Sequence, residues 1–423
     1  MDVQISRIFT EICINPVKIR EICTSTNLIF TQLLKHEQRT NNFKFNLMKR
    51  IKTTPRPNWE AQVENLGFGF HTLESIYWDE SAYYEFTMSE IETIEKATAE
   101  LWALCLEAVD HVIQKKLYSK FHIPQWIIPH IEKTWNDDAP SIYGRFDFTF
   151  QKGVPKLLEF NADTPTSLFE TGVVQWDWLQ SVAPDNDQFN SVHEKLVAYW
   201  RTLRKYLHRG EVVFTCVKDS LEDTTTTEYM RDTAVQAGLT TRFEFLEDLG
   251  WDEVAHYFVN SDDEPIKNIF KLYPWEWLLH DEFGKHLMED RIKAHWIEPS
   301  WKMILSNKAI LAVLWELFPH CPYLLPTYFD SVDLNSYVRK PLLSREGANI
   351  QVVKNNQFLM ETEGEYGEEG YIYQELCELP TFDGNHVLVG SWVIGQEPAG
   401  IGLRESDSMI TDNGSRFLPH LIA

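Results

Sequence analysis

Four polar residues of the sequence have the chemistry of a metal and phosphate site. Arg145 and Asp147 alternate with phenylalanines, and further along the chain Glu159 and Asn161 alternate with apolar residues. Carboxylate and amide oxygens are ligands that Mg²⁺ prefers, and water and phosphate usually complete the shell of this ion. An arginine beside such a cluster can bind the phosphate that the metal carries. The residue types therefore allow a magnesium site with a phosphate-binding cation next to it.

A β-hairpin is the element that would bring these four side chains together. Apolar and polar residues alternate with a period of two on both sides of the segment QKGVP, which is typical of two strands joined by a turn. We expect Phe150 to pair with Lys156 across a five-residue loop. This register sets Asp147 opposite Glu159, and it places the other two polar residues opposite one another on the same face.

The opposed carboxylates favour the metal interpretation of this hairpin. Two carboxylates that face each other repel and raise each other's pKa unless a cation lies between them. A divalent metal ion removes the conflict, which a purely structural hairpin should avoid. The alternative is a surface hairpin with a solvated polar face, in which Arg145 is a local salt-bridge partner. We predict Asp147, Glu159 and Asn161 as metal ligands.

The composition excludes some classes of partner. The chain has 423 residues, of which 43% are hydrophobic and 15 are Trp, and its net charge is −24. At this length two or three lobes with a large, aromatic core are expected. The negative charge argues against a nucleic-acid partner, because such binding draws on Lys and Arg, and it is compatible with a cationic substrate such as a polyamine.

Cysteine spacing and hydropathy predict a cytoplasmic protein. The six cysteines lie far apart with no CxxC pair, so neither a zinc knuckle nor a disulfide framework is expected and a reducing compartment is the default. No apolar stretch of about 18 residues, long enough for a membrane span, is present. The N-terminus lacks the apolar core and cleavage site of a signal peptide. We therefore expect no membrane partner.

Residues 1–47 differ in charge from the rest of the chain. Their six Lys and Arg against four Asp and Glu give +2, where the whole chain has −24. The segment MKRIKTTPRPNWEAQ, which begins at Met48, is typical of a natural N-terminus. We predict that residues 1–47 are a loosely ordered extension or a misassigned start. An amphipathic targeting helix is less favoured, because acidic residues interrupt it.

The remaining residues divide into three expected parts of a mixed α/β (α+β) protein. Residues 48–210 contain the hairpin and a long helix from Ser89, with Ser89 and Glu92 as its capping box. Residues 211–300 alternate short apolar runs with a helical stretch, the pattern of a βαβ lobe with parallel strands. Residues 301–423 begin with a helix and are mostly β after it.

Two lysines outside the hairpin occupy positions that suit a phosphate. Ser306 and Asn307 are expected to cap a helix, so that Lys308 lies on its first turn, where the helix dipole disfavours a cation. A bound phosphate would compensate, although a solvated lysine explains the pattern as well. Lys340 ends an apolar strand before SREGAN, a small-residue loop able to close over phosphates but unlike a P-loop.

Candidate contacts for other substrates lie in two further segments. The hydroxyls of Thr164, Thr166 and Ser167 precede a helical stretch and suit an anion site or ordinary caps equally. Glu222 and Asp223 belong to KDSLEDTTTTE, which we expect to be a loop at the carboxyl end of a parallel sheet. There they could meet an amine, although solvated acids are commoner in loops.

Long ordered motifs span the chain from about Lys49 to Ala423: YGRFDF, LLEFNADTPTSL, LYPWEW, SNKAILAVLWELFP, VRKPLLSREGANI, GIGLRESD and SRFLPH. They closely resemble the glutathionylspermidine synthase family, specifically its ATP-grasp synthetase half and the stand-alone acid–amine ligases similar to it. The resemblance implies an ATP-grasp-like synthetase in which residues 211–300 form a pre-ATP-grasp lobe and residues 301–423 bind the nucleotide. The amidase domain of the bifunctional members has no counterpart, so no hydrolytic half is expected.

The resemblance also implies cofactors, ATP and two Mg²⁺ ions, and roles for single residues. Asp147, Glu159 and Asn161 would hold the ions that bridge the ATP phosphates. Arg145 would be the catalytic residue that contacts the γ-phosphate and stabilises the transferring phosphoryl group. The other residues implied to bind the nucleotide are Phe146 beside Asp147, Lys308 and Lys340 at the phosphates, Gly347 in the covering loop, Gln374 near the adenine, Arg404 facing the phosphates, and Met409, Ile410 and Thr411.

The reaction implied by the resemblance joins two small molecules, an acid and an amine. A carboxylate attacks the γ-phosphorus of ATP, and an amine then displaces phosphate from the acyl phosphate to give an amide. The acid would be peptide-like, such as glutathione, and the amine a polyamine, but Thr164, Glu222 and Asp223 match the family's substrate positions only loosely. The identities of the two substrates stay open.

Two other classes of function also stay open. The chain could be a regulatory protein that binds ATP and Mg²⁺ without ligating, although such a protein needs Arg145 less. It could also be a metal-dependent hydrolase that uses the same carboxylates. A hydrolase would need a general base near the metal, and no histidine lies in the hairpin or its flanks.

Overall fold

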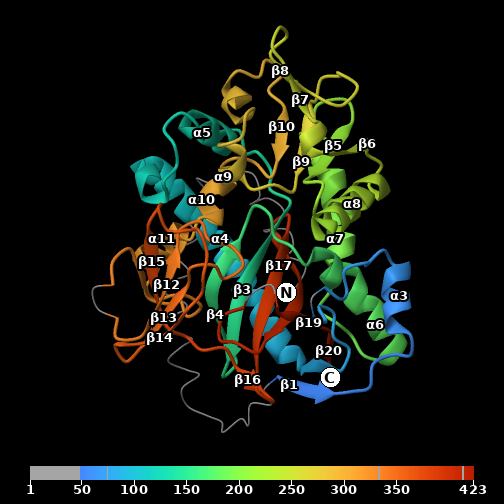
Figure 1. Ribbon diagram of the computed structural model, residues 1–423, viewed down its shortest axis with the longest axis vertical. Coiled ribbons are helices and arrows are strands. Elements are labelled where there is room, and N and C mark those ends of the chain that lie inside the picture. The colour runs from blue at the N-terminus through green and yellow to red at the C-terminus, as the bar shows by residue number, and fades with distance from the viewer. Residues whose placement is uncertain (1–47, 74, 332–333, 412–413) are drawn as a thin grey trace, which may run out of the picture. The chain divides into compact units, whose positions relative to one another are not determined.

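The computed structural model describes residues 48–73, 75–331, 334–411 and 414–423. The prediction of an N-terminal extension over residues 1–47 lies outside these described residues. The described residues belong to one compact unit that mixes helices with parallel and antiparallel sheets (Figure 1). The predicted mixed α/β class is therefore confirmed.

An antiparallel sheet of six strands holds the predicted hairpin. In Figure 1 the green strands β3 and β4 lie beside the red strand β17, although more than half of the chain separates them in sequence. The strand order is β19-β18-β17-β3-β4, with β16 paired to β17. The bounds are Tyr143–Gln151 for β3, Val154–Asn161 for β4, Thr381–Phe382 for β16, Asn385–Ile394 for β17, Glu397–Ser406 for β18 and Arg416–Leu418 for β19.

This sheet joins strands from the first and the third of the predicted parts of the chain. Residues 143–161 pair directly with residues 385–394. The three-part division of the chain stays a prediction about its organisation.

Helix α4, Met88–Lys115, packs against β4, β17 and β18 and begins at a different cap from the predicted one. Thr87, not Ser89, accepts the N–H of Glu90, and the Glu90 carboxylate accepts the N–H of Thr87 at 2.9 Å. The Glu90 carboxylate also accepts the N–H of Met48 at 2.7 Å. This tertiary contact fixes Glu90 at the cap, whereas Glu92 points to solvent.

A sheet of four parallel strands, in the order β10-β9-β5-β6, confirms the βαβ pattern. Helix α8 packs against β5, β6 and α7. One of the apolar runs behaves differently, because β8 (Tyr257–Val259) pairs antiparallel with β7 (Gly250–Asp252) in a separate hairpin. The bounds of the parallel strands are Val212–Cys216 for β5, Thr241–Phe245 for β6, Asn268–Lys271 for β9 and His295–Ile297 for β10.

The expected loop KDSLEDTTTTE is mostly helix, so this prediction is wrong. Helix α8 spans Leu221–Gln236, and the hydroxyl of Ser220 caps it by accepting the N–H of Asp223 at 3.1 Å. A run of threonines has low intrinsic helix propensity. Thr226 and Thr227 are nevertheless fully buried, and their packing in the protein overrides the local preference.

The third predicted part is mostly β, as expected. Its main element is an antiparallel sheet in the order β11-β15-β12-β13-β14. The bounds are Thr327–Tyr328 for β11, Tyr337–Pro341 for β12, Gln351–Lys354 for β13, Gln357–Glu361 for β14 and Tyr371–Glu375 for β15.

The remaining elements are one small sheet and several helices. A small sheet of β1 (Lys49–Lys52), β2 (Ala82–Phe86) and β20 (His420–Ile422) joins the two ends of the described chain. The other helices are α3 (Trp59–Asn65), η1 (Leu117–Phe121), α5 (Ile128–Asn136), η2 (Glu170–Val174), α6 (Gln175–Val182), α7 (Val192–Leu203), η3 (Leu246–Asp248), α9 (Trp275–Leu278), η4 (Gly284–Met288), α10 (Lys302–Ser306) and α11 (Ala309–Leu317).

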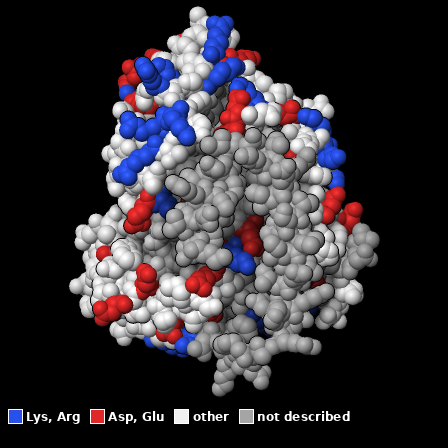
Figure 2. Space-filling model, turned by 180° about the vertical axis from the view of Figure 1, so that it is seen from behind, with Lys and Arg blue, Asp and Glu red and all other residues white. Residues whose placement is uncertain are grey.

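The charged surface is uneven. Figure 2 shows Lys and Arg side chains gathered in the upper part of one face, at the end where Figure 1 places β7, β8 and β10. Basic groups thus collect locally on a chain whose net charge is −24. In the part of the chain that the structure describes, no helix is both long and apolar enough to cross a bilayer.

Candidate active site

The hairpin has the predicted register at its polar end and a different one at its turn. Asp147 lies opposite Glu159, as predicted, and the pair of Arg145 and Asn161 follows. Phe150, however, pairs with Pro155 instead of Lys156. The difference of one residue is absorbed by an irregularity of the ladder between residues 147 and 148.

The turn explains this correction. Only Lys152 and Gly153 separate the two strands, and their φ angles of 54° and 74° are those of a tight two-residue hairpin turn. The predicted five-residue loop included Pro155 in the turn. Pro155 instead lies within β4, which is the last strand on its side of the sheet, where a missing N–H is tolerated.

Arg145 and Asp147 form a buried, two-pronged ion pair. The Nε of Arg145 lies 2.6 Å from Oδ1 of Asp147, and its Nη2 lies 2.9 Å from Oδ2. The third nitrogen, Nη1, donates to the carbonyl oxygen of Thr166 at 2.6 Å. All three nitrogens of the guanidinium are therefore held, which fixes the arginine on the predicted metal face.

Gly390 makes room for this arginine, and we did not identify it from the sequence. It lies opposite Asp147 on β17, and a Cβ atom placed on it would be 2.9 Å from Cδ of Arg145. A side chain there would push the guanidinium away from its place. The glycine in VLVGSWV is the only sequence signal, since an isolated glycine in a strand often marks close approach of a neighbour.

Asn161 bridges the two carboxylates. Its Nδ2 donates to Oδ2 of Asp147 at 3.1 Å and to Oε1 of Glu159 at 3.2 Å. Turned over, the same amide would present its oxygen, and the three side chains would offer the hard oxygen donors that suit Mg²⁺. Among the described residues no group of three His, Cys, Asp or Glu side chains converges as a metal cluster; this predicted set contains only two carboxylates.

Burial and neighbouring charges push the pKa values of the two carboxylates apart. Burial raises the pKa of Asp147, although Arg145 opposes the shift. Burial also acts to raise the pKa of Glu159, but Lys308 and Lys340 outweigh it and lower that pKa to about 2. Burial lowers the pKa of Lys340 to about 8 against the pull of Glu159. The two lysines thus supply the cations that the opposed carboxylates require.

Lys308 reaches the hairpin from the helical layer. Its Nζ lies 3.4 Å from Oε2 of Glu159 and donates to the carbonyl oxygen of Ser344 at 2.5 Å. The predicted cap holds only in part: Oδ1 of Asn307 accepts the N–H of Ala309 at 2.9 Å, but the N-cap position of α11 is Lys308 itself, and Ser306 ends α10. Lys308 therefore lies where the helix starts, and its charge faces the metal face.

Lys340 and Gln374 meet at the main chain of β4. The Nζ of Lys340 donates to the carbonyl oxygen of Leu158 and to Oε1 of Gln374, both at 2.8 Å. The Nε2 of Gln374 donates to the carbonyl oxygen of Leu157 at 3.1 Å. The structure thus brings two predicted nucleotide residues from neighbouring strands onto β4.

The predicted covering loop meets the segment after β18. Gly347 has a φ of +71°, and a Cβ on it would lie 2.7 Å from the carbonyl oxygen of Thr411 and 2.9 Å from Cγ2 of Ile410. Ile410 packs with Ile350 in a small apolar cluster, and Met409 beside it is half-buried. The structure therefore groups the predicted residues 347 and 409–411.

Two predicted nucleotide residues differ in how they face the site. The Nε of Arg404 on β18 is buried and has no hydrogen-bond partner among the described residues, so it suits an anion. Phe146 is fully buried, with its ring 3.9 Å from that of Phe160 between centroids. Its side chain belongs to the core, and only its main chain is left for a nucleotide contact.

The predicted substrate positions frame a second side of the site. Oγ1 of Thr164 accepts Nη1 of Arg345 at 2.9 Å, and Glu276 accepts Nη2 of the same arginine at 2.5 Å. Arg345 was missed by sequence reasoning, although it lies in the noted segment SREGAN. Burial raises the pKa of Glu222, and burial together with Glu222 raises the pKa of Asp223 to about 6.

Two recesses flank these residues. The empty space is about 440 Å³ in the first and about 850 Å³ in the second, and both volumes include space open to solvent. Arg345 borders both. The first is lined by residues that include Glu159, Asn161, Thr164, Lys308 and Ser344, and the second by Trp277, Glu346, Gly347, Thr362 and Tyr366.

Residues 50–423 match the family described as glutathionylspermidine synthase preATP-grasp. The chain belongs to the glutathionylspermidine synthase family. A Haemophilus influenzae protein assigned as an acid–amine ligase is 41% identical over 391 residues, which cover 88% of this chain and 99% of that protein. The family predicted from the sequence motifs is thereby confirmed.

Two longer relatives match over part of their length. Trypanothione synthetase of Crithidia fasciculata is 31% identical over 327 residues, covering 70% of this chain and 50% of that protein. The bifunctional glutathionylspermidine synthetase/amidase of Escherichia coli K12 is 28% identical over 371 residues, covering 80% and 59%. This member of the family is an ATP-dependent ligase that forms C–N bonds, as predicted.

Proposed function

We propose that this ligase joins a peptide-like acid to an amine through an acyl phosphate, on the polar face of β3 and β4. The observation that carries the proposal is the convergence of the buried Asp147 and the partly buried Glu159, bridged by Asn161, with cations from separate elements. Four cations surround two carboxylates there: Arg145, Lys308, Lys340 and Arg404. Such an excess of positive charge suits a triphosphate, in a chain that is acidic as a whole.

The metal-binding role belongs to the three oxygen-bearing side chains in this proposal. Asp147, Glu159 and Asn161 would hold Mg²⁺, with two ions expected, and the metal would offset phosphate charge during transfer. Arg145 stays on the same face, where its fixed guanidinium can stabilise the transferring phosphoryl group.

The proposed nucleotide site uses the strands that surround β4. Lys308 and Lys340 bind phosphates, Gln374 lies toward the adenine, and Arg404 presents a buried donor that still lacks a partner among the described residues. The segment with Gly347 covers the phosphates, together with residues 409–411 and the main chain of residue 146.

The chemistry proceeds in two steps. The substrate carboxylate attacks the γ-phosphorus, a C–O–P linkage forms, and ADP leaves. The amine nitrogen then attacks the acyl carbon, the C–O bond to phosphate breaks, and the nitrogen loses a proton as the amide forms. Alignment and exclusion of water are the contributions of the protein, because water would hydrolyse the acyl phosphate.

The substrate classes follow from charge and from the relatives. Glu222 and Asp223 lie on the first turn of α8 and supply negative charge for a polyamine-like amine. Thr164 contributes a hydroxyl toward a peptide-like acid such as glutathione. The names of the longer relatives, a trypanothione and a glutathionylspermidine synthetase, support these classes. We place the reaction in the cytoplasm, because Cys105, Cys216, Cys321 and Cys377 are free thiols.

The test is a screen for ADP release that pairs peptide-like acids, including glutathione, with polyamines and amino acids. We expect ADP only when both members of one pair are present, with the amide product detected by mass spectrometry. The variant Asp147→Asn is the inactive control. ATP binding without ADP release across the whole panel would instead favour the regulatory protein considered above.

A further inference from the structure

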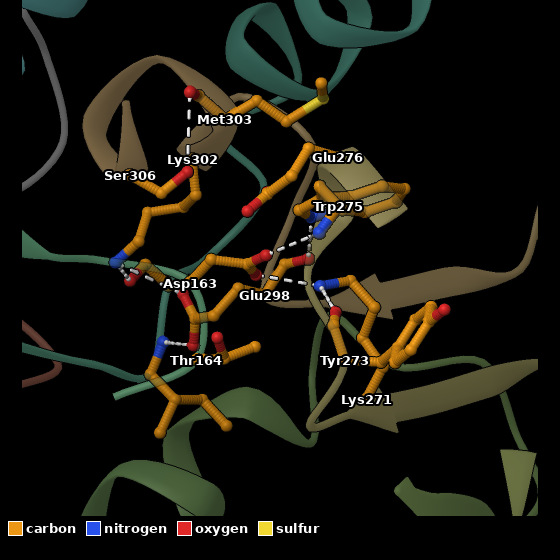
Figure 3. A network of polar contacts seen from close by, with 12 residues as sticks. Asp163, Thr164, Lys271, Tyr273, Trp275, Glu276, Glu298, Lys302, Met303 and Ser306 are labelled. Carbon is orange, nitrogen blue, oxygen red and sulfur yellow. Dashed lines mark hydrogen bonds and ion pairs between the residues drawn. The ribbon is translucent and has the colours of Figure 1, made fainter. Parts of the chain in front are cut away.

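A network of buried charges lies directly behind the metal face. Asp163 follows the metal ligand Asn161 by two residues and is 1% exposed. Oδ1 of Asp163 accepts Nζ of Lys271 at 2.7 Å, and Oδ2 accepts the main-chain N–H of Trp275 at 2.8 Å. Figure 3 shows these two donors approaching Asp163, with Lys271 also donating to the carbonyl oxygen of Tyr273 at 2.9 Å.

A second buried pair extends the network to the start of β3. Oε1 of Glu298 accepts the N–H of Ile142 at 2.8 Å, and Oε2 lies 3.4 Å from Nζ of Lys302. Lys302 in turn donates to the carbonyl oxygen of Tyr143 at 2.9 Å. The indole N–H of Trp275 donates to the carbonyl oxygen of Glu298 at 3.1 Å, so one tryptophan joins both pairs.

Stability alone does not explain these charges. The side chains of Asp163, Lys271, Glu298 and Lys302 are all fully buried. Taking four charges out of water costs about as much as their attraction returns, and apolar residues of the same shape often serve stability better. In some proteins buried polar or ionic groups instead specify one arrangement of the segments that carry them. Here these segments are the open end of the hairpin, residues 142–143 and 161–164, and the carboxyl ends of β9 and β10 with the residues that follow them.

The arrangement that Asp163 fixes has a direct consequence for Arg345. The residue after Asp163 is Thr164, and the residue after Trp275 is Glu276. These two neighbours are the side chains that grip the guanidinium of Arg345, through Nη1 at 2.9 Å and Nη2 at 2.5 Å. The contact between Asp163 and Trp275 therefore sets the spacing between the two acceptors of Arg345.

Arg345 connects Thr164 and Glu276 to the segment that is proposed to cover the nucleotide. It lies in the segment 342–349, which carries Gly347 and whose residue Ser344 accepts Lys308. Its guanidinium also lies 5.6 Å from the ring of Trp277. A shift of Thr164 relative to Glu276 would release Arg345 and, with it, the segment above the phosphates.

We propose that Asp163 is a positioning residue: by tying residues 161–164 to residues 271–276, it holds Thr164 and Glu276 at the spacing that keeps segment 342–349 closed over the nucleotide. The inference rests on the proposed function, since it assumes that this segment covers ATP. Both carboxylate oxygens of Asp163 are buried and already accept bonds from Lys271 and Trp275. Its effect reaches the reaction only through Arg345.

The main test uses a double variant that keeps shape and removes charge. In Asp163→Leu with Lys271→Met, apolar side chains of similar shape replace the ion pair, and the bond to Trp275 is lost. We expect the folded variant to bind ATP with an affinity within a few fold of wild type, and its kcat to fall about a hundredfold, as for a misplaced active-site group. Hydrogen exchange of amides 343–350 should lose the protection that MgATP gives in the wild type.

A matched control removes a buried ion pair elsewhere. In Glu80→Gln the carboxylate that accepts Arg56 Nη2 at 2.7 Å is neutralised, away from the site. We expect lower stability but unchanged kcat and unchanged MgATP protection of residues 343–350. If the double variant does not fold, Asp163→Asn replaces it, with the same readouts and a fall in kcat of about tenfold, because the amide oxygen can still accept Trp275.

The outcomes separate the two proposals. If MgATP protects amides 343–350 in the wild type, and the folded variant shows the same protection and the same kcat, the positioning role is overturned. The proposed function would be unaffected by that result. A wild-type protein that shows neither ADP release nor any response to MgATP would overturn the proposed function, and the inference that rests on it.

Discussion

The guanidinium of Arg145 forms a two-pronged ion pair with Asp147, its neighbour but one on the same strand, through Nε at 2.6 Å and Nη2 at 2.9 Å. Alternating strand geometry puts both side chains on one face, and the remaining nitrogen of the arginine is held by a main-chain carbonyl. The guanidinium is therefore already fixed in its position, and binding of a phosphate would require no reorganisation of this arginine.

Glu159→Gln should abolish turnover and leave the fold intact. The change keeps the shape of the side chain and the bridge from Asn161 but removes one of two carboxylate ligands beside Lys308. We expect ADP release to fall at least about a hundredfold. Glu92→Gln on the exposed face of α4 is the control. Unchanged ADP release from Glu159→Gln would remove the metal assignment.

Lys340→Met should chiefly weaken ATP binding. The lysine is buried, and its ammonium donates to the carbonyl oxygen of Leu158 and to Gln374. Loss of one charged hydrogen bond to phosphate predicts an increase in Kd of about tenfold to a hundredfold, measured by calorimetry. Lys354→Met removes an exposed lysine of the neighbouring strand, paired with Glu378, and should leave Kd unchanged. Equal affinities for both variants would refute the role of Lys340.

Gly390→Ala should damage activity more than its size suggests. The added Cβ would lie 2.9 Å from Cδ of Arg145, so the arginine must move. We expect a loss of about 1–3 kcal/mol in the free energy of unfolding, as for other overpacked sites, together with a clear fall in kcat. Gly69→Ala meets its nearest neighbour at an ordinary 3.6 Å and serves as the control. Full activity of Gly390→Ala would show that the position of Arg145 is not critical.

His420 should make the protein less stable in mild acid. Burial lowers its pKa to about 3, its Nδ1 meets Oε1 of Gln175 at 2.9 Å, and its Nε2 has no partner among the described residues. Because the pKa is lower in the folded state than the usual value of about 6.5, stability present above that value is lost as the pH falls toward 3.

The size of this effect can be measured directly. Because His420 stays neutral in the folded protein, the free energy of unfolding at pH 5 should be lower by about 2 kcal/mol than it is well above pH 6.5. Urea unfolding of wild type and His420→Gln at pH 7 and pH 5 isolates the contribution, because glutamine can keep the bond to Gln175 and does not titrate. An identical pH dependence in both proteins would contradict the prediction.

Sequence periodicity predicted the structure correctly where the structure depends on residues that are close together in the chain. A period of two placed Asp147 opposite Glu159, because side chains on a strand alternate between faces regardless of what packs against them. The parallel strands of the middle part followed from local patterns in the same way. The turn was predicted with five residues and has two, and the irregular ladder absorbed the resulting one-residue difference in register.

The sequence by itself determined the hairpin, the polar side chains on its face and the family, since these lie in continuous stretches of chain. Only the tertiary structure decided that Gly390 leaves space for Arg145, that α8 begins at Leu221 and that Asp163 pairs with Lys271, 108 positions further along the chain. Contacts of this kind leave no periodic signal, because they arise when separate elements pack and exclude water from the groups between them.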